Sequence, residues 1–98
     1  MAKRVYCAGP MTGYPELNYP AFHAAAARLR EQGYEVVSPA ELNPIETGYQ
    51  EAMRVNIRAL IECDHITFLD GWEESKGATL ERHIAEVLGI PELVTGER

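Results

Sequence analysis

The chain has 98 residues, of which 46% are hydrophobic and 24% are charged, and its formal net charge is -6. These values are ordinary for a globular protein and exclude disordered and collagen-like architectures. The acidic balance and the scattered arginines disfavour binding to the phosphate backbone of DNA or RNA. We therefore expect a single domain over residues 1–98 that binds a small molecule rather than a nucleic acid polymer.

Membrane, export and metal classes are disfavoured as well. No apolar run approaches the roughly 20 residues that a membrane span needs, and the N-terminus lacks the pattern of an export signal, so we expect a cytoplasmic protein. Cys7 and Cys63 lie in apolar segments without metal-ligand spacing, which predicts reduced buried thiols and no metal site. A domain this small gains stability from a second copy, so we expect a homodimer or a larger homo-oligomer.

The first half of the chain predicts a strand, a helix and a second strand. Residues 5–8 form a short apolar run that reads as a buried strand. Asn18 is placed to cap a helix whose apolar residues recur at helical spacing, and Gly33 ends that helix. Residues 34–37 then form the second predicted strand.

The second half repeats this alternation. It predicts a helix at about residues 49–62, a strand over residues 65–69, a helix at about residues 77–88 and a last strand around residues 92–94. Such alternation is typical of a three-layer α/β fold, in which a parallel sheet of four or five strands carries helices on both faces.

In a parallel sheet of this kind, ligands bind beyond the carboxyl ends of the strands. Three segments meet there: Gly9 to Gly13, Ser38 with Pro39, and Asp70 to Gly77. The first of them, which contains Pro10 and Met11, is neither a dinucleotide fingerprint nor a P-loop. By itself it indicates only a tight turn of the backbone.

The last predicted helix carries a carboxylate next to its apolar face. The expected buried stripe of this helix consists of Leu80, Ile84, Val87 and Leu88. Glu81 lies at the edge of that stripe in the first turn, where the helix dipole favours a carboxylate and keeps it ionised. Gly77 and Ala78 leave space for a ligand. Glu81 is therefore either a nucleophile for an electrophilic carbon or a simple partner of the dipole.

Three more residues have two readings each. Asn56 falls in the middle of the apolar stripe of the preceding helix, with Tyr49 on the same side. A buried amide costs on the order of 1–3 kcal/mol unless its hydrogen bonds are made, so Asn56 either bonds a neighbouring loop or contacts a ligand. Ser75 either caps the last helix or binds a phosphate. Trp72 either stacks on a base or covers the core.

The chain resembles the nucleoside 2-deoxyribosyltransferase superfamily through three motifs in order. They are YCAGPM at residues 6–11, the interval from Asn56 to Asp64 that ends a helix in Cys-Asp, and W-x-x-S-x-G-A-x-x-E at residues 72–81. The resemblance covers nearly the whole chain and is closest to a small branch that is common in phage genomes. It implies a flavodoxin- or Rossmann-like fold, no metal or organic cofactor, and neighbouring subunits that complete each other's sites.

The resemblance also implies roles. The residue matching Glu81 attacks the anomeric carbon of a 2-deoxyriboside, and water or a second base resolves the covalent intermediate. Tyr6 matches the residue that orients this nucleophile, and Ser75 matches one that binds a 5'-phosphate. Asn56 stands where the superfamily commonly has an Asp that assists the departing base. An amide donates a hydrogen bond but no proton, so general-acid help would have to come from Asp70, from a partner subunit, or from nothing.

Two functions follow as hypotheses. The first is cleavage or transfer at the N-glycosidic bond of 2'-deoxynucleosides or their 5'-monophosphates, with Glu81, Tyr6, Asn56 and Asp70 as catalytic residues. The second is a non-catalytic module that binds a nucleotide in the same cleft. In both, the expected ligand-binding residues are Gly9, Pro10, Met11, Asn18, Pro39, Trp72, Ser75, Gly77 and Ala78.

Overall fold

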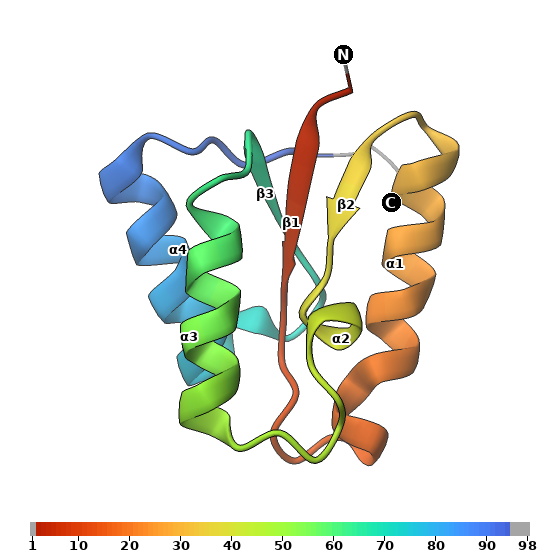
Figure 1. The fold of residues 1–98 in the computed structure, drawn as a ribbon, viewed down its shortest axis with the longest axis vertical. Helices are drawn as coiled ribbons and strands as arrows, with labels where there is room; N and C mark the ends of the chain where they lie inside the picture. Colours follow the sequence, from red (N-terminus) through yellow and green to blue (C-terminus); the bar gives the residue numbers. More distant parts are fainter. Residues whose placement is uncertain (1, 95–98) are drawn as a thin grey trace.

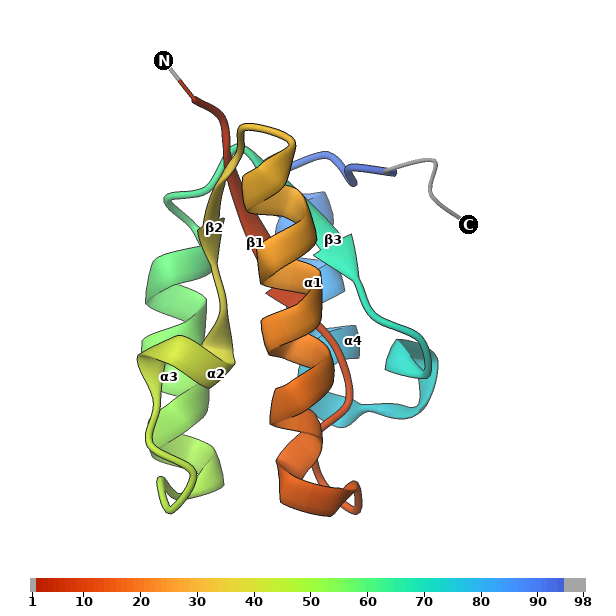
Figure 2. The same cartoon turned by 90° about the vertical axis from the view of Figure 1, so that its right-hand side faces the viewer.

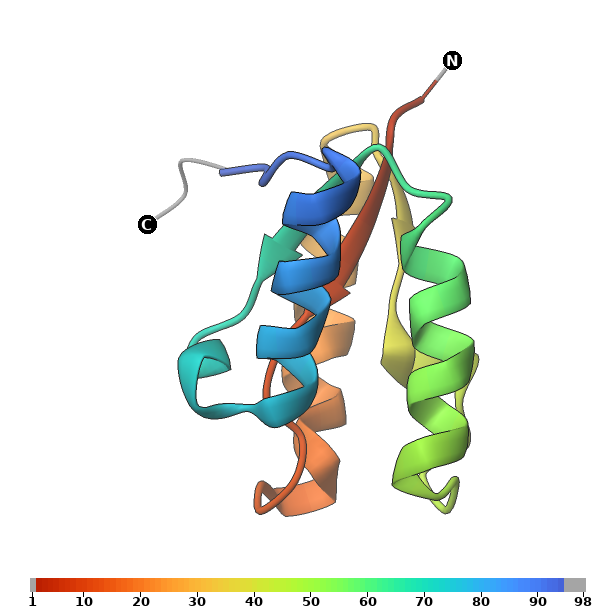
Figure 3. The ribbon, with the colours of Figure 1, turned by 90° about the vertical axis from the view of Figure 1, so that its left-hand side faces the viewer.

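In the computed structural model, which describes residues 2–94, a parallel sheet lies between two layers of helices (Figure 1). Its strands are β1 (Arg4–Ala8), β2 (Glu35–Val37) and β3 (His65–Phe68), in the order β2-β1-β3. Helix α1 (Tyr19–Glu31) covers one face (Figure 2), and α3 (Tyr49–Leu60) and α4 (Lys76–Leu88) lie side by side on the other (Figure 3). The predicted three-layer α/β architecture is thus confirmed.

The prediction of four or five strands is wrong for the described residues. Instead of a fourth strand, only Glu92 forms a parallel bridge, and it does so with Ile66. The N–H of Ile66 donates to the carbonyl of Pro91 at 3.0 Å, and the N–H of Leu93 donates to the carbonyl of Ile66 at 2.8 Å. Within residues 2–94, these two hydrogen bonds flank a single bridge, and no longer ladder forms beside β3. Residues 1 and 95–98 of the predicted domain lie outside the described part.

Strand β1 is buried on both faces, and its side chains alternate between two hydrophobic clusters. Val5 and Cys7 point to the α1 side, whereas Tyr6 and Ala8 point to the side of α3 and α4. This alternation follows from the two-residue period of a strand. It delivers the hydroxyl group of Tyr6 to the inner face of α4. Cys7 and Cys63 are buried free thiols, as predicted.

The face that α4 buries differs from the predicted one. The buried residues are Ala78, Glu81 and Ala85, whereas Leu80, Val87 and Leu88 are 44%, 69% and 54% exposed. Of the predicted stripe, only Ile84 packs against the core in the described residues. The helix is therefore rotated so that its small residues face the sheet. This rotation moves Glu81 from the edge of the buried face to its centre.

An aromatic contact accompanies this rotation. Trp72 packs on Phe68 with the ring centroids 4.5 Å apart, and the guanidinium of Arg82 lies 5.6 Å from the centroid of the Trp72 ring. This cation–π contact attaches Arg82, and with it one side of α4, to Trp72. Trp72 belongs to the residues that pack against the core.

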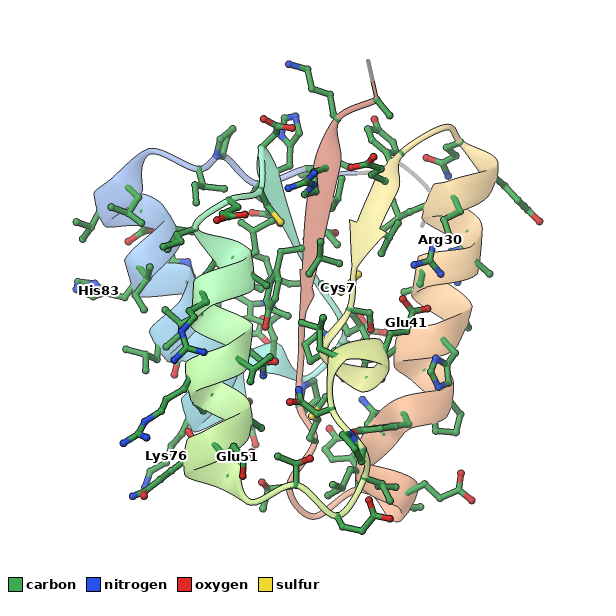
Figure 4. All side chains as sticks on the ribbon, in the orientation of Figure 1. Cys7, Arg30, Glu41, Glu51, Lys76 and His83 are labelled. Atoms are coloured by element: carbon green, nitrogen blue, oxygen red, sulfur yellow. The ribbon has the colours of Figure 1, made fainter. Side chains whose placement is uncertain are left out.

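The segments between the main elements contain three short helical turns: η1 (Pro15–Asn18), α2 (Pro39–Leu42) and η2 (Trp72–Glu74). The sequence did not predict α2, which Ser38 caps by accepting a hydrogen bond from the N–H of Ala40. Arg30 of α1 makes two hydrogen bonds of 2.6 and 2.7 Å to Glu41 of α2 (Figure 4). This ion pair joins α2 to α1.

Asn18 does not cap α1 through its side chain, although it occupies the predicted position. Its backbone is left-handed, with a φ of 64°, and its Nδ2 donates to the carbonyl of Pro10 at 2.9 Å. The amide thereby ties the loop after β1 to the start of α1. Separately, no helix in residues 2–94 is both long and apolar enough to cross a membrane.

Candidate functional site

A cavity of about 620 Å³ opens at the carboxyl ends of the strands. Its walls come from the loop after β1, from Pro39 at the start of α2, from the segment after β3, and from α3 and the first half of α4. Both helices begin at this end of the sheet (Figure 3). The volume falls within the range of pockets that hold small organic ligands. The predicted location of the site therefore coincides with a cavity.

The side chains of Glu81 and Tyr6 form a hydrogen bond at the wall of this cavity. Glu81 is 3% exposed and Tyr6 is fully buried. The hydroxyl of Tyr6 donates to Oε2 of Glu81 at 2.8 Å. Within residues 2–94, no protein group donates to the other carboxyl oxygen, Oε1, and Glu81 lines the cavity. One oxygen is thus held by the protein while the carboxyl group reaches the ligand space.

Burial raises the pKa of Glu81 to about 7, although the hydrogen bond from Tyr6 acts in the opposite direction. The expectation that the helix dipole keeps this carboxyl fully ionised is therefore wrong near neutral pH. Burial, followed by the charge of Glu81, raises the pKa of Tyr6 well above its usual value. Tyr6 consequently remains a hydrogen-bond donor, and Glu81 exists in both protonation states around pH 7.

Asn56 is 5% exposed, lines the cavity and also bonds a neighbouring loop. Its Oδ1 accepts a hydrogen bond of 2.9 Å from Nδ2 of Asn43, which is 6% exposed. The same Nδ2 donates to the carbonyl of Pro39 at 3.0 Å. The reading that Asn56 bonds a neighbouring loop is therefore confirmed, whereas contact with a ligand stays a prediction for a residue that borders the cavity.

Ser75 caps α4, because its Oγ accepts a hydrogen bond of 3.1 Å from the N–H of Ala78. The hydroxyl proton of Ser75 is then free to donate into the cavity, which Ser75 also lines. Next to it, Gly77 permits a close approach of α4 to α3. A Cβ atom added there would lie 3.2 Å from Sδ of Met53 and 3.6 Å from the hydroxyl oxygen of Tyr49.

The cavity brings together most of the residues that the sequence singled out. Its walls contain Gly9, Pro10, Met11, Pro39, Asn56, Ser75, Gly77, Ala78 and Glu81, with Tyr6 directly behind Glu81. Asn18 and Asp70 line a different cavity, of about 740 Å³, bordered by α1 and by β3 with its following loop. Trp72 covers the core and does not line the Glu81 cavity.

Several wall residues were not named individually from the sequence. Thr12, Gly71, Glu74 and Lys76 lie within the segments predicted to meet at the site, and the others are Tyr14, Phe22, Tyr49, Ala52 and Met53. The sequence pattern places Tyr49 on the same side as Asn56, and Met53 recurs with both at helical spacing, so Asn56 could have identified Met53 as well. Lys76 lies at the first turn of α4, at the same end of the molecule as Glu51 (Figure 4). Its place directly after the capping Ser75 was the available signal.

The part of the chain from residue 2 to 94 contains no group of three His, Cys, Asp or Glu side chains that could hold a metal ion.

Asn43, which bonds Asn56, was also not identified from the sequence. It lies between the end of α2 and Pro44, in a segment without hydrophobic periodicity. Nothing in the local pattern indicates that its amide reaches α3.

Comparison with known proteins gives a family and a fold. The profile of a family described as "Domain of unknown function (DUF4406)" matches residues 3–94. The structure of a 2-deoxyribosyltransferase from the psychrotolerant bacterium Bacillus psychrosaccharolyticus is similar, with a TM-score of 0.71 over 97% of this chain and 75% of that chain. The two sequences are 24% identical, so the likeness shows a shared fold. No curated protein matches the chain significantly.

Proposed function

We propose that this chain, which belongs to the DUF4406 family of domains of unknown function, cleaves or transfers at the N-glycosidic bond of 2'-deoxynucleosides or their 5'-monophosphates. The observation that supports this most is the hydrogen bond from Tyr6 to the buried carboxyl of Glu81 at the wall of a cavity of about 620 Å³. The fold that the chain shares with a 2-deoxyribosyltransferase supports the same chemistry.

In the proposed reaction the ionised carboxylate of Glu81 attacks C1' of the deoxyribose. The bond from C1' to the base nitrogen breaks, and its electron pair leaves with the base. The product is a covalent deoxyribosyl ester, which water resolves in a hydrolase and a second base resolves in a transferase. Tyr6 holds Oε2, so that Oε1 is the oxygen available for attack.

The other wall residues would bind the substrate. Asn56 contacts the base, while the hydroxyl of Ser75 and the free N–H groups in the first turn of α4 seat the ribose or a 5'-phosphate. Lys76 adds a positive charge at the same rim of the cavity. Asn18, Asp70 and Trp72 have no part in this proposal, because they do not line the cavity that contains Glu81.

The alternative function is a non-catalytic module that binds a nucleotide in the same cleft. Asn56 favours it, because an amide at the base-contacting wall cannot deliver a proton to a departing base. Assembly into a homodimer or larger oligomer, a cytoplasmic location and kinship with a branch common in phages stay predictions from the sequence.

Incubation with a panel of 2'-deoxynucleosides and their 5'-monophosphates, followed by mass-spectrometric detection of free base, tests the proposal. Base release should disappear in Glu81→Gln, which keeps the size of the side chain. The control is Glu86→Gln, the same change at an exposed position of the same helix, and it should retain activity. Thermal stabilisation by a nucleotide without any base release would reject the enzyme and support the binding module.

A further inference from the structure

Asn43 and Asn56 form a chain of two side-chain amides beneath the cavity. Nδ2 of Asn43 lies 3.0 Å from the carbonyl oxygen of Pro39 and 2.9 Å from Oδ1 of Asn56. The carbonyl of Pro39 also accepts the backbone N–H of Asn43 at 3.1 Å. The backbone of α2 thus fixes this carbonyl oxygen in place.

That carbonyl decides which way both amides point. A carbonyl oxygen only accepts, so the atom of Asn43 that faces Pro39 must be the amide nitrogen. This nitrogen carries a second hydrogen, which points at Asn56, and the atom of Asn56 that receives it must be the oxygen. The amide nitrogen of Asn56 is consequently turned away from Asn43.

The nitrogen of Asn56 is directed to the cavity. Within residues 2–94 no protein atom accepts a hydrogen bond from it, and the one fully buried side-chain nitrogen or oxygen without a partner there is Nδ1 of His65. Since Asn56 is itself a wall residue, the solvent-accessible side of its amide is the NH₂ group. At this point the wall therefore presents the NH₂ group of Asn56 to a ligand as a hydrogen-bond donor.

We infer that Asn43 is a positioning residue that fixes Asn56 as a hydrogen-bond donor to the substrate base, and that the site thereby selects bases able to depart without protonation. The inference rests on the proposed function and narrows its substrate class. The base must place an acceptor, a carbonyl oxygen or an unprotonated ring nitrogen, against Asn56. A base that presents an N–H group there would place its donor against the donor of Asn56. Both N–H groups would then lack an acceptor, which weakens binding.

The same geometry defines how the base leaves. The base takes the electron pair of the bond to C1' and departs as an anion, while the carboxylate of Glu81 becomes a neutral ester. Asn56 stabilises the new negative charge by a hydrogen bond and transfers no proton. Water protonates the base after departure. The rate therefore depends on how acidic the free base is.

Two substrates of nearly equal shape test this dependence. The base of 5-fluoro-2'-deoxyuridine is more acidic than that of 2'-deoxyuridine, and fluorine is close in size to hydrogen. We expect kcat/KM of the wild-type protein to favour the fluorinated nucleoside by about tenfold or more, because Asn56 gives the departing base a hydrogen bond but no proton. Equal rates for the two nucleosides would show that an acid protonates the base, and would overturn the inference.

Asn43 itself is tested by Asn43→Ala beside Tyr19→Phe. The hydroxyl of Tyr19 donates to the backbone carbonyl of Asn43 at 2.9 Å, so Tyr19→Phe removes a bond to the same residue and leaves the amide chain intact. We expect Asn43→Ala to lower kcat/KM about tenfold for both nucleosides, with the ratio between the two nucleosides unchanged. Tyr19→Phe should lower thermal stability without changing kcat/KM. An unchanged kcat/KM in Asn43→Ala contradicts a positioning role.

A spectroscopic readout separates this inference from the proposed function. In ¹⁵N-labelled Glu81→Gln protein, 5-fluoro-2'-deoxyuridine should shift the side-chain NH₂ resonances of Asn56 and leave those of Asn43 in place. If these shifts occur although the wild-type protein releases no base, the proposed reaction fails and the donor role of Asn56 stands. If base is released but the Asn56 resonances do not move, the reaction stands and the inference falls.

Discussion

Replacing Glu81 by Gln should make the protein more stable at alkaline pH. Burial raises the pKa of this carboxyl from 4.5 to about 7, so the folded chain binds the proton more tightly than the unfolded chain does. A raised carboxyl pKa makes stability fall as the pH rises from the unfolded to the folded value. The cost is absent below about pH 4.5 and complete above about pH 7. The amide introduced by Glu81→Gln would keep an acceptor for Tyr6 and would not titrate.

The shift sets the expected magnitude. One pKa unit corresponds to about 1.4 kcal/mol, so the wild-type protein should lose about 3 kcal/mol relative to Glu81→Gln between pH 4.5 and pH 8. Urea denaturation of both proteins at several pH values measures this difference. Titration of other groups cancels, since it is common to both. Glu86→Gln, at a side chain that is 57% exposed, serves as the control and should show no comparable change.

A difference between wild type and Glu81→Gln that stays constant from pH 4.5 to pH 8 would refute this reasoning. It would mean that Glu81 ionises at its usual pKa, and therefore that water or a cation reaches the carboxyl group. The pocket wall would then lack the desolvation that the burial of Glu81 indicates.

Two further predictions concern the walls of the same cavity. Tyr6→Phe removes the hydrogen bond that lowers the pKa of Glu81, so the rising limb of the pH–activity profile should move to higher pH; an unmoved limb would mean that another group ionises there. Gly9→Ala should destabilise the fold by about 1–3 kcal/mol in urea denaturation, because the added Cβ would lie 2.8 Å from Cβ of Leu69. If the variant unfolds at the same urea concentration as the wild type, the loop after β1 moves to accommodate the Cβ without measurable cost.

The sequence predicts the elements well because their signals are local. The apolar run of β1, the helical spacing in α1 and the stop at Gly33 each depend on neighbours within a few residues. The prediction of a fourth strand was wrong because strand pairing depends on residues that are distant in the sequence. Whether residues 92–94 continue a ladder along β3 depends on a partner more than twenty residues earlier, and only Glu92 meets it. Strand propensity alone carries no information on such pairing.

The rotation of α4 shows a second limit. A helical wheel places the largest apolar residues inward, which predicted Leu80, Val87 and Leu88 as core. In the structure the inward positions belong to Ala78, Glu81 and Ala85. Small side chains let a helix approach a sheet closely, and the large ones then remain outside. The wheel weighs hydrophobicity and ignores the space between helix and sheet.

The candidate site was found at the residues where the local rules fail. Asn56 was identified as an amide in an apolar stripe, and Glu81 as a carboxylate beside another. Their partners were harder to find. Tyr6 was named through the resemblance of YCAGPM, and Asn43 not at all, since a hydrogen bond across 13 residues and two elements leaves no periodic trace. Sequence reasoning thus locates the anomaly more readily than the group that satisfies it.

The energetics of Glu81 argue that its burial serves a ligand and not the fold. An ionised carboxyl in this position costs about 3 kcal/mol at pH 8, whereas a small domain has only about 5–15 kcal/mol of stability in total. This cost remains after the hydrogen bond from Tyr6 has already lowered the pKa of Glu81. A glutamine or an apolar residue would close the core at lower cost. A charge at this wall is therefore consistent with the proposed role of Glu81 in the reaction. The difference in stability between wild type and Glu81→Gln across pH measures how much stability the fold loses by carrying it.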